Sequence, residues 1–254
     1  MSTSSASRME PLISAITRYR PTFRGEIEGY TSEDIERHQA LVGRTLPGPY
    51  VDFLRNMGRG MGELCFQNGD FRLETLTRHY ARAGASRDGA LVIGISLYES
   101  GEQPIELDED EDSGEFVLTA YPPPERPREF AESIQIFDLV EPTLYEALFA
   151  KAYLQYRWPQ FPHQQTLFFA ANSPREVERG AAQMAAFGFE QHAESTVVRY
   201  FERHDATAIL SPNPGESVRL SLATRDKVRM QELVEGLSKR LAATPSPPPP
   251  FKQA

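Results

Sequence analysis

Two helical periods between residues 31 and 62 dominate the hydrophobic pattern of the chain. In each, apolar residues recur three and four positions apart, which places them on one face of a helix. The residues on this face are Ile35, His38 and Val42 in the first period and Tyr50, Phe53, Leu54 and Met57 in the second. The pattern predicts two short helices that bury these faces, with His38 as a hydrogen-bonded histidine of the core.

The residues that flank these two periods predict where each helix begins and ends. Thr31 or Ser32 can cap the first helix, because a hydroxyl accepts an unpaired N–H of the first turn, and Gly43 ends that helix. Pro49 suits the first turn of the second helix, where a missing N–H costs nothing. Gly58 is expected to close the second helix in a left-handed conformation.

The rest of the N-terminal part alternates short apolar runs with turn signals, which favours strands. The predicted strands lie at 64–66, 71–73, 91–93, 104–107, 116–119 and 134–137, and further helices lie at 10–19, 75–83 and 142–156. Asn68-Gly69, between the first two runs, predicts a β-hairpin. Helices followed by mostly antiparallel strands and a closing helix indicate an α+β fold, with the helix pair packed on a mostly antiparallel sheet.

A second, smaller unit follows the proline-containing stretch 157–163. Its predicted strands lie at 166–171, 197–201, 207–210 and 218–222, and its helices at 173–188 and 224–241. The order βαβββα predicts a two-layer domain. The expected organisation is an N-terminal extension with a short helix (1–28), a first domain (29–158), a second domain (164–243) and a disordered proline-rich tail (244–254).

Composition and charge narrow the function classes. Net charge is −9 in 254 residues. The 26 acidic and 16 basic residues up to Phe161 give −10, and the remainder gives +1. A negative balance argues against nucleic-acid binding and favours a basic partner. No signal peptide or membrane-length apolar run is present, so we expect a cytoplasmic protein without a membrane partner. Cys65, the single cysteine, excludes an intrachain disulfide and is expected to be buried and inert.

The most conspicuous candidate site is a cluster of acidic residues near two predicted strands. The candidate partner-binding residues are Tyr98, Glu99, Glu102, Asp108, Glu109, Asp110, Glu111, Asp112 and Glu115. A concentrated negative field can steer a basic protein, and a merely solvated hairpin loop is the alternative. Asp108, Asp110 and Asp112 also have the spacing of a calcium loop, but Ser113 and Thr119 replace its glycine and its bidentate glutamate.

No pattern of catalytic, cofactor-binding or metal-binding residues emerges elsewhere. The five histidines lack the spacing of a helical zinc pair. The glycine run 58–62 follows a helix instead of preceding one, and Glu63 stands where a phosphate-binding loop needs a third glycine. We therefore predict no catalytic residue, no cofactor and no metal, and expect that the protein is not an enzyme.

The helix pair resembles the SUKH superfamily of Smi/Knr-like proteins, and the similarity extends over residues 29–149. The residues that carry the resemblance are Ile35, Leu46, Pro47, Tyr50, Phe53, Leu54 and 58–62. The resemblance implies a bacterial immunity protein that binds a cognate polymorphic toxin, possibly a nuclease, and neutralises it by occlusion. The acidic residues would then cover a basic face of the toxin. The alternative that the family offers is a non-enzymatic scaffold or regulatory adaptor.

Overall fold

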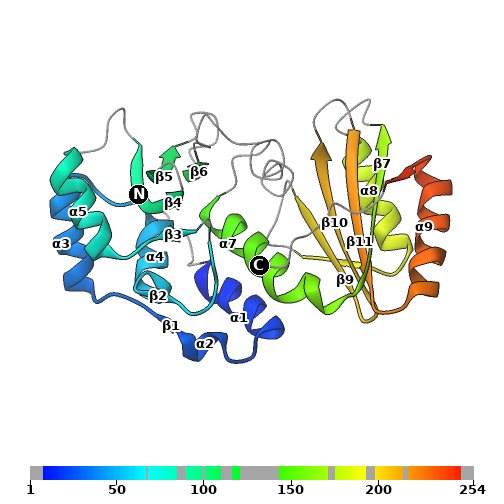
Figure 1. Cartoon of the computed structure of the whole chain (residues 1–254), viewed down its shortest axis with the longest axis horizontal. Helices are drawn as coiled ribbons and strands as arrows, with labels where there is room; N and C mark the ends of the chain where they lie inside the picture. Colours follow the sequence, from blue (N-terminus) through cyan, green and yellow to red (C-terminus); the bar gives the residue numbers. More distant parts are fainter. Residues whose placement is uncertain are drawn as a thin grey trace, which may run out of the picture. The chain divides into compact units, whose positions relative to one another are not determined.

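The computed structural model of the chain describes residues 8–66, 68–84, 90–98, 101–109, 116–120, 143–170, 175–192, 198–213 and 217–246. These residues form two compact units, the first ending at Tyr156 and the second beginning at Arg157 (Figure 1). Both combine helices with antiparallel sheets, so the predicted α+β class is confirmed. Within the described residues, no helix is both long and apolar enough to span a membrane.

The first unit places helices around a four-stranded antiparallel sheet of order β3-β4-β5-β6. Helix α5 packs on β4, α3 packs on α5 and α4, and α7 packs on α1 and β6. A separate two-stranded ribbon joins β1 to β2. The elements are α1 (Met9–Tyr19), α2 (Phe23–Glu26), β1 (Ile27–Glu28), α3 (Ser32–Val42), α4 (Gly48–Met57), β2 (Gly60–Met61), β3 (Gly69–Asp70), α5 (Leu73–Ala83), β4 (Leu91–Tyr98), β5 (Gly101–Glu109), β6 (Phe116–Ala120) and α7 (Leu144–Ala152).

The predicted helix pair is confirmed as α3 and α4. Thr31 caps α3 through a capping box, in which its side chain accepts from the Asp34 N–H and Asp34 accepts from the Thr31 N–H. Gly43 ends α3 in the left-handed region, at φ 76°. All the predicted inward positions are buried, including Tyr50, Phe53 and Leu54 at 0% exposure.

Gly58 does follow the second helix, but the left-handed conformation predicted for it was wrong. Its φ is −65°, an ordinary right-handed value. A Cβ there would lie 2.7 Å from Leu54 Cα, so the position needs glycine because the chain passes close to the backbone of α4. The helix exit continues into β2, which pairs with β1.

Asparagine substitutions separate these two uses of glycine. Asparagine tolerates a left-handed conformation, and nothing lies within 4 Å of a Cβ at Gly43. Because the positive φ strains even asparagine, we expect Gly43→Asn to cost no more than about 1 kcal/mol, the low end of the left-handed penalty. Gly58→Asn meets a fixed backbone and should cost roughly 1–3 kcal/mol. Urea unfolding measures both, and equal losses would contradict the assignment.

The predicted hairpin at Asn68-Gly69 is also wrong. Strand β3 pairs with Ser96 and Ile95 of β4, not with residues 64–66. The apolar residues that flank the turn pack against each other instead, with the Phe66 and Phe71 rings 5.4 Å apart. Cys65 is exposed, contrary to expectation, because the buried Leu64 and Phe66 on either side direct it outward.

His38 is buried between two tyrosines of the core, as predicted, but it is not hydrogen-bonded. Its side chain is 3% exposed, and its ring centroid lies 6.3 Å from Tyr50 and 6.0 Å from Tyr80. Neither ring nitrogen has a hydrogen-bond partner among the described residues. Burial lowers the pKa of His38 to about 4, because desolvation disfavours the charged imidazolium.

His38 therefore makes stability depend on pH in a defined window. Between the ordinary pKa of 6.5 and the native value of about 4, the unfolded chain binds a proton that the folded chain does not. The contribution to stability falls as pH drops through this window, by roughly 3 kcal/mol at most, and is constant below it. His38→Phe should be at least as stable at pH 7 and should lose this part of the slope. Urea unfolding of both proteins at pH 7, 5.5 and 4 tests this, and parallel profiles would contradict it.

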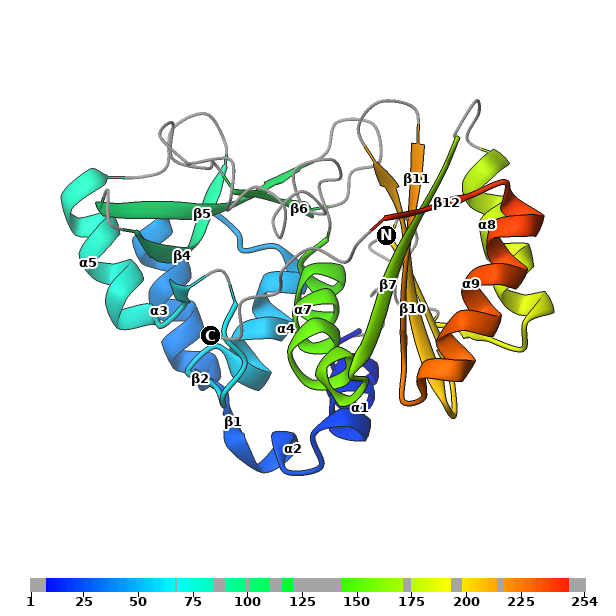
Figure 2. The ribbon, with the colours of Figure 1, turned by 45° about the vertical axis from the view of Figure 1, so that its right-hand side comes forward.

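The second unit is a six-stranded antiparallel sheet of order β12-β7-β11-β10-β9-β8, with α8 and α9 on one face (Figures 1 and 2). Its core lies between that face and the two helices, and includes Leu167, Phe201, Leu210, Leu220 and Leu237. The elements are β7 (His163–Ala170), α8 (Arg175–Ala186), β8 (Glu190–Gln191), β9 (Arg199–Arg203), β10 (Ala206–Asn213), β11 (Ser217–Thr224), α9 (Lys227–Leu241) and β12 (Thr244–Ser246).

The structure extends the predicted second unit at two places. The short strand β8 pairs with β9 and was not predicted. The tail was expected to be disordered from residue 244, but Thr244–Ser246 forms β12 beside β7. The final helix begins at Lys227 with Asp226 as its cap, three residues later than predicted. The predicted strand at 134–137 lies outside the described residues.

Candidate functional site

Strand β5 carries the described part of the predicted acidic site. Successive residues of a strand point to opposite faces, so Glu102, Glu106 and Asp108 share one face of the sheet, opposite the buried Ile105 and Leu107. We call these three residues the acidic face. Burial and the nearby Asp108 carboxylate raise the pKa of Glu106, as expected where like charges are close together.

The other predicted residues of this site fall into two groups. Glu109 ends β5 and is exposed, and its N–H donates to the Asp108 carboxylate at 2.9 Å. Tyr98 ends β4, beside Gly101 of β5. Among the described residues, no arginine or lysine forms an ion pair with Glu102, Asp108 or Glu109. Outside the described residues lie Glu99, Asp110, Glu111, Asp112 and Glu115.

Strands β5 and β6 pair across the acidic loop, as the sequence predicted. Glu109 lies opposite Phe116, and the ladder continues to Ile105 opposite Ala120. The calcium alternative depends on Asp110 and Asp112, which lie outside the described residues. No group of three histidine, cysteine, aspartate or glutamate side chains within the described ranges is arranged to hold a metal ion.

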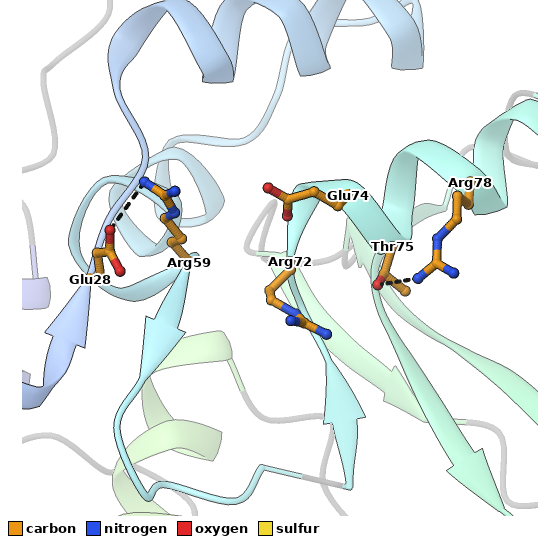
Figure 3. Close-up of a pocket in the computed structure, with 6 residues that line it drawn as sticks. All are labelled: Glu28, Arg59, Arg72, Glu74, Thr75 and Arg78. Atoms are coloured by element: carbon orange, nitrogen blue, oxygen red, sulfur yellow. Dashed lines mark hydrogen bonds and ion pairs between the residues drawn. The ribbon is translucent and has the colours of Figure 1, made fainter.

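A second candidate site in the first unit was not predicted. It is a cavity of about 510 Å³ between the exit of α4 and the start of α5. We call it the arginine pocket, and its lining residues are Glu28, Arg59, Arg72, Glu74, Thr75 and Arg78 (Figure 3). Glu28 comes from β1 and Arg59 from the turn before β2, whereas the other four come from the first turns of α5 and the residue before it.

Ion pairs and short hydrogen bonds hold the walls of the arginine pocket. Arg59 pairs with Glu28 at 3.1 Å. Arg72 donates two parallel hydrogen bonds, of 2.9 and 2.7 Å, to the carboxylate of Asp70. These bonds lower the pKa of Asp70 to about 2. The hydroxyl of Thr75 donates to Asp70 and accepts from Arg78 at 3.0 Å.

Tyr30 connects the two sides of this pocket through its hydrogen bonds. Its backbone N–H donates to the carbonyl of Leu54 near the end of α4, at 2.8 Å. Its hydroxyl donates to Glu74 at 2.7 Å and accepts from the Leu73 N–H at 3.0 Å. Arg72, the residue at the cap position of α5, makes no side-chain cap bond, so Tyr30 satisfies one of the unpaired donors of the first turn.

The sequence held little signal for the arginine pocket. Its residues come from separate segments that share no periodic pattern, and Arg59 is prominent in the sequence only as part of a glycine run. Arg72 falls in a predicted strand and Arg78 in a predicted helix, and their spacing by itself is typical of a solvated surface. The Tyr30 contacts, which join residues more than 40 positions apart, help to bring the segments together.

Comparisons with known proteins leave the class of this protein open. No protein-family model matches the chain, and no curated protein matches it. One similar solved structure is the NMR structure of PA4090 from Pseudomonas aeruginosa, with 14% sequence identity and a TM-score of 0.25. The match covers 33% of this chain and 95% of that chain. A likeness this weak identifies neither a fold family nor a function.

The role of Tyr30 predicts the behaviour of Tyr30→Phe. The variant keeps the ring but loses both hydroxyl bonds, which should cost roughly 1–2 kcal/mol of unfolding free energy. The hydrogen bond from Tyr30 is the main cause that lowers the pKa of Glu74, so that pKa should rise in the variant. Urea unfolding and carboxyl-carbon NMR titration measure the two effects. An unchanged Glu74 pKa would show that this hydrogen bond is not formed.

Proposed function

We propose that this chain is an immunity protein that binds and neutralises a cognate bacterial toxin by stoichiometric occlusion. Two observations support the proposal: the resemblance of the helix pair to the SUKH superfamily, and the acidic face. We infer the contact surface from the placement of Glu102, Glu106 and Asp108 on one side of β5. The proposed partner is therefore a toxin with a basic surface.

The acidic face suits a basic protein for electrostatic reasons. Carboxylates without a cationic partner attract an oppositely charged surface, which raises the association rate. Glu102 and Asp108 are exposed and form no ion pair within the described chain, so binding breaks no such pair. The β-sheet holds these groups at fixed spacing, which avoids the entropy cost of ordering them.

Charge reversal on this face tests the proposal. The variant Glu102→Lys/Asp108→Lys should lose protection in cells that co-express the protein encoded immediately upstream of this gene. It should also weaken the purified complex at least tenfold, mainly through slower association. Growth after toxin induction and surface plasmon resonance at two salt concentrations provide the readouts.

Glu36→Lys is the matched control for the single reversal Asp108→Lys, because Glu36 is exposed on α3, away from the sheet strands. This variant reverses one charge on another surface of the same unit and should retain protection. Equal weakening by both would indicate a net-charge effect and contradict the assigned face. Killing that the wild-type protein does not alter, with no complex on gel filtration, would contradict the function itself.

A further inference from the structure

The arginine pocket gathers three guanidinium groups, beside Glu28 and Glu74, within a unit that is acidic as a whole. Three guanidinium groups line one cavity, and they come from two walls (Figure 3). Arg59 lies across from Arg72 and Arg78, with Thr75 between the latter two. The Tyr30 hydrogen bond, and to a lesser degree the charge of Arg59, lower the pKa of Glu74. Residues of both walls line the same pocket.

Most hydrogen-bond donors of these arginines remain unused by the described residues. Each guanidinium carries five N–H donors. Arg59 bonds Glu28 through one nitrogen, and Arg78 bonds only the Thr75 hydroxyl. Arg72 uses one edge of its fork on Asp70. Arg78 has no acidic partner in the described parts of the chain, so its guanidinium remains available to an anion.

The acidic groups at the pocket are already engaged. Glu28 pairs with Arg59, Asp70 pairs with Arg72, and Glu74 accepts the Tyr30 hydroxyl. The first turn of α5, an eleven-residue helix, adds the positive end of its dipole to the same wall. Cavity, free donors and dipole together favour an anion with several acceptor oxygens.

We propose that the arginine pocket binds a phosphate group, carried either by a small phosphate ester or by a phosphorylated side chain. The planar fork of arginine matches phosphate oxygens in a bidentate arrangement. A volume of about 510 Å³ accommodates a phosphate and a few atoms of its carrier. All six lining residues are polar, which suits a small hydrophilic carrier better than a nucleobase that needs an aromatic face.

The test is a titration of the full chain, followed by ¹H–¹⁵N NMR, with inorganic phosphate, glycerol phosphate and a phosphoserine peptide. Saturable shifts at Thr75 and Glu74, and no shifts with the unphosphorylated peptide, are expected. Tighter binding of the phosphopeptide identifies a protein-borne phosphate, and tighter binding of glycerol phosphate identifies a small ester. The absence of saturable shifts with all three probes would overturn the proposal.

Three variants locate the site. Arg78→Gln should weaken binding roughly tenfold, because it removes charged donors. Arg82→Gln, one turn further along α5 and outside the lining, is the matched control and should bind normally. Glu74→Gln should strengthen binding about two- to fivefold, because it removes a like charge. Equal effects of Arg78→Gln and Arg82→Gln, or no effect of Glu74→Gln, would contradict the site.

Discussion

The hydrogen bonds of the Tyr30 hydroxyl are the interactions on which the arginine pocket of the first unit depends. The hydroxyl is at once a donor to Glu74 and an acceptor for the first N–H of α5. Since the Tyr30 backbone is bonded near the end of α4, this residue links the start of α5 to α4, beside the packing of both helices on α3. Desolvation, followed by the Glu74 bond, raises the pKa of Tyr30 to about 12. The hydroxyl therefore stays protonated and keeps both bonds at physiological pH.

That constraint explains why one unit can present two surfaces of opposite charge. The acidic face belongs to β5, where the pleat separates carboxylates from the apolar core. The arginine pocket belongs to the junction of α4 and α5, where Glu28 comes from β1 and the arginines lie outside the strands. Each arginine is held instead by a local acceptor, namely Glu28, Asp70 or Thr75. Opposite charges thus coexist because different structural elements fix them.

The features that were predicted correctly from the sequence are those set by residues close together in the chain. The capping box at Thr31 and the apolar stripes of α3 and α4 are short-range features, and they were confirmed. The hairpin at Asn68-Gly69 failed because β4 competes for the same backbone groups. For the site, the alternation along β5 was predictable from the sequence, whereas the arginine pocket was not. It depends on contacts between residues more than 40 positions apart.

Helix α5 links the two surfaces, because it starts at the pocket and carries Tyr80. The Tyr80 hydroxyl bonds both the N–H and the carbonyl of Val92, which lies opposite Glu106 in the sheet. These buried bonds join α5 directly to the strand that pairs with the acidic face. Helix α5 is therefore a direct structural connection between the arginine pocket and the acidic face.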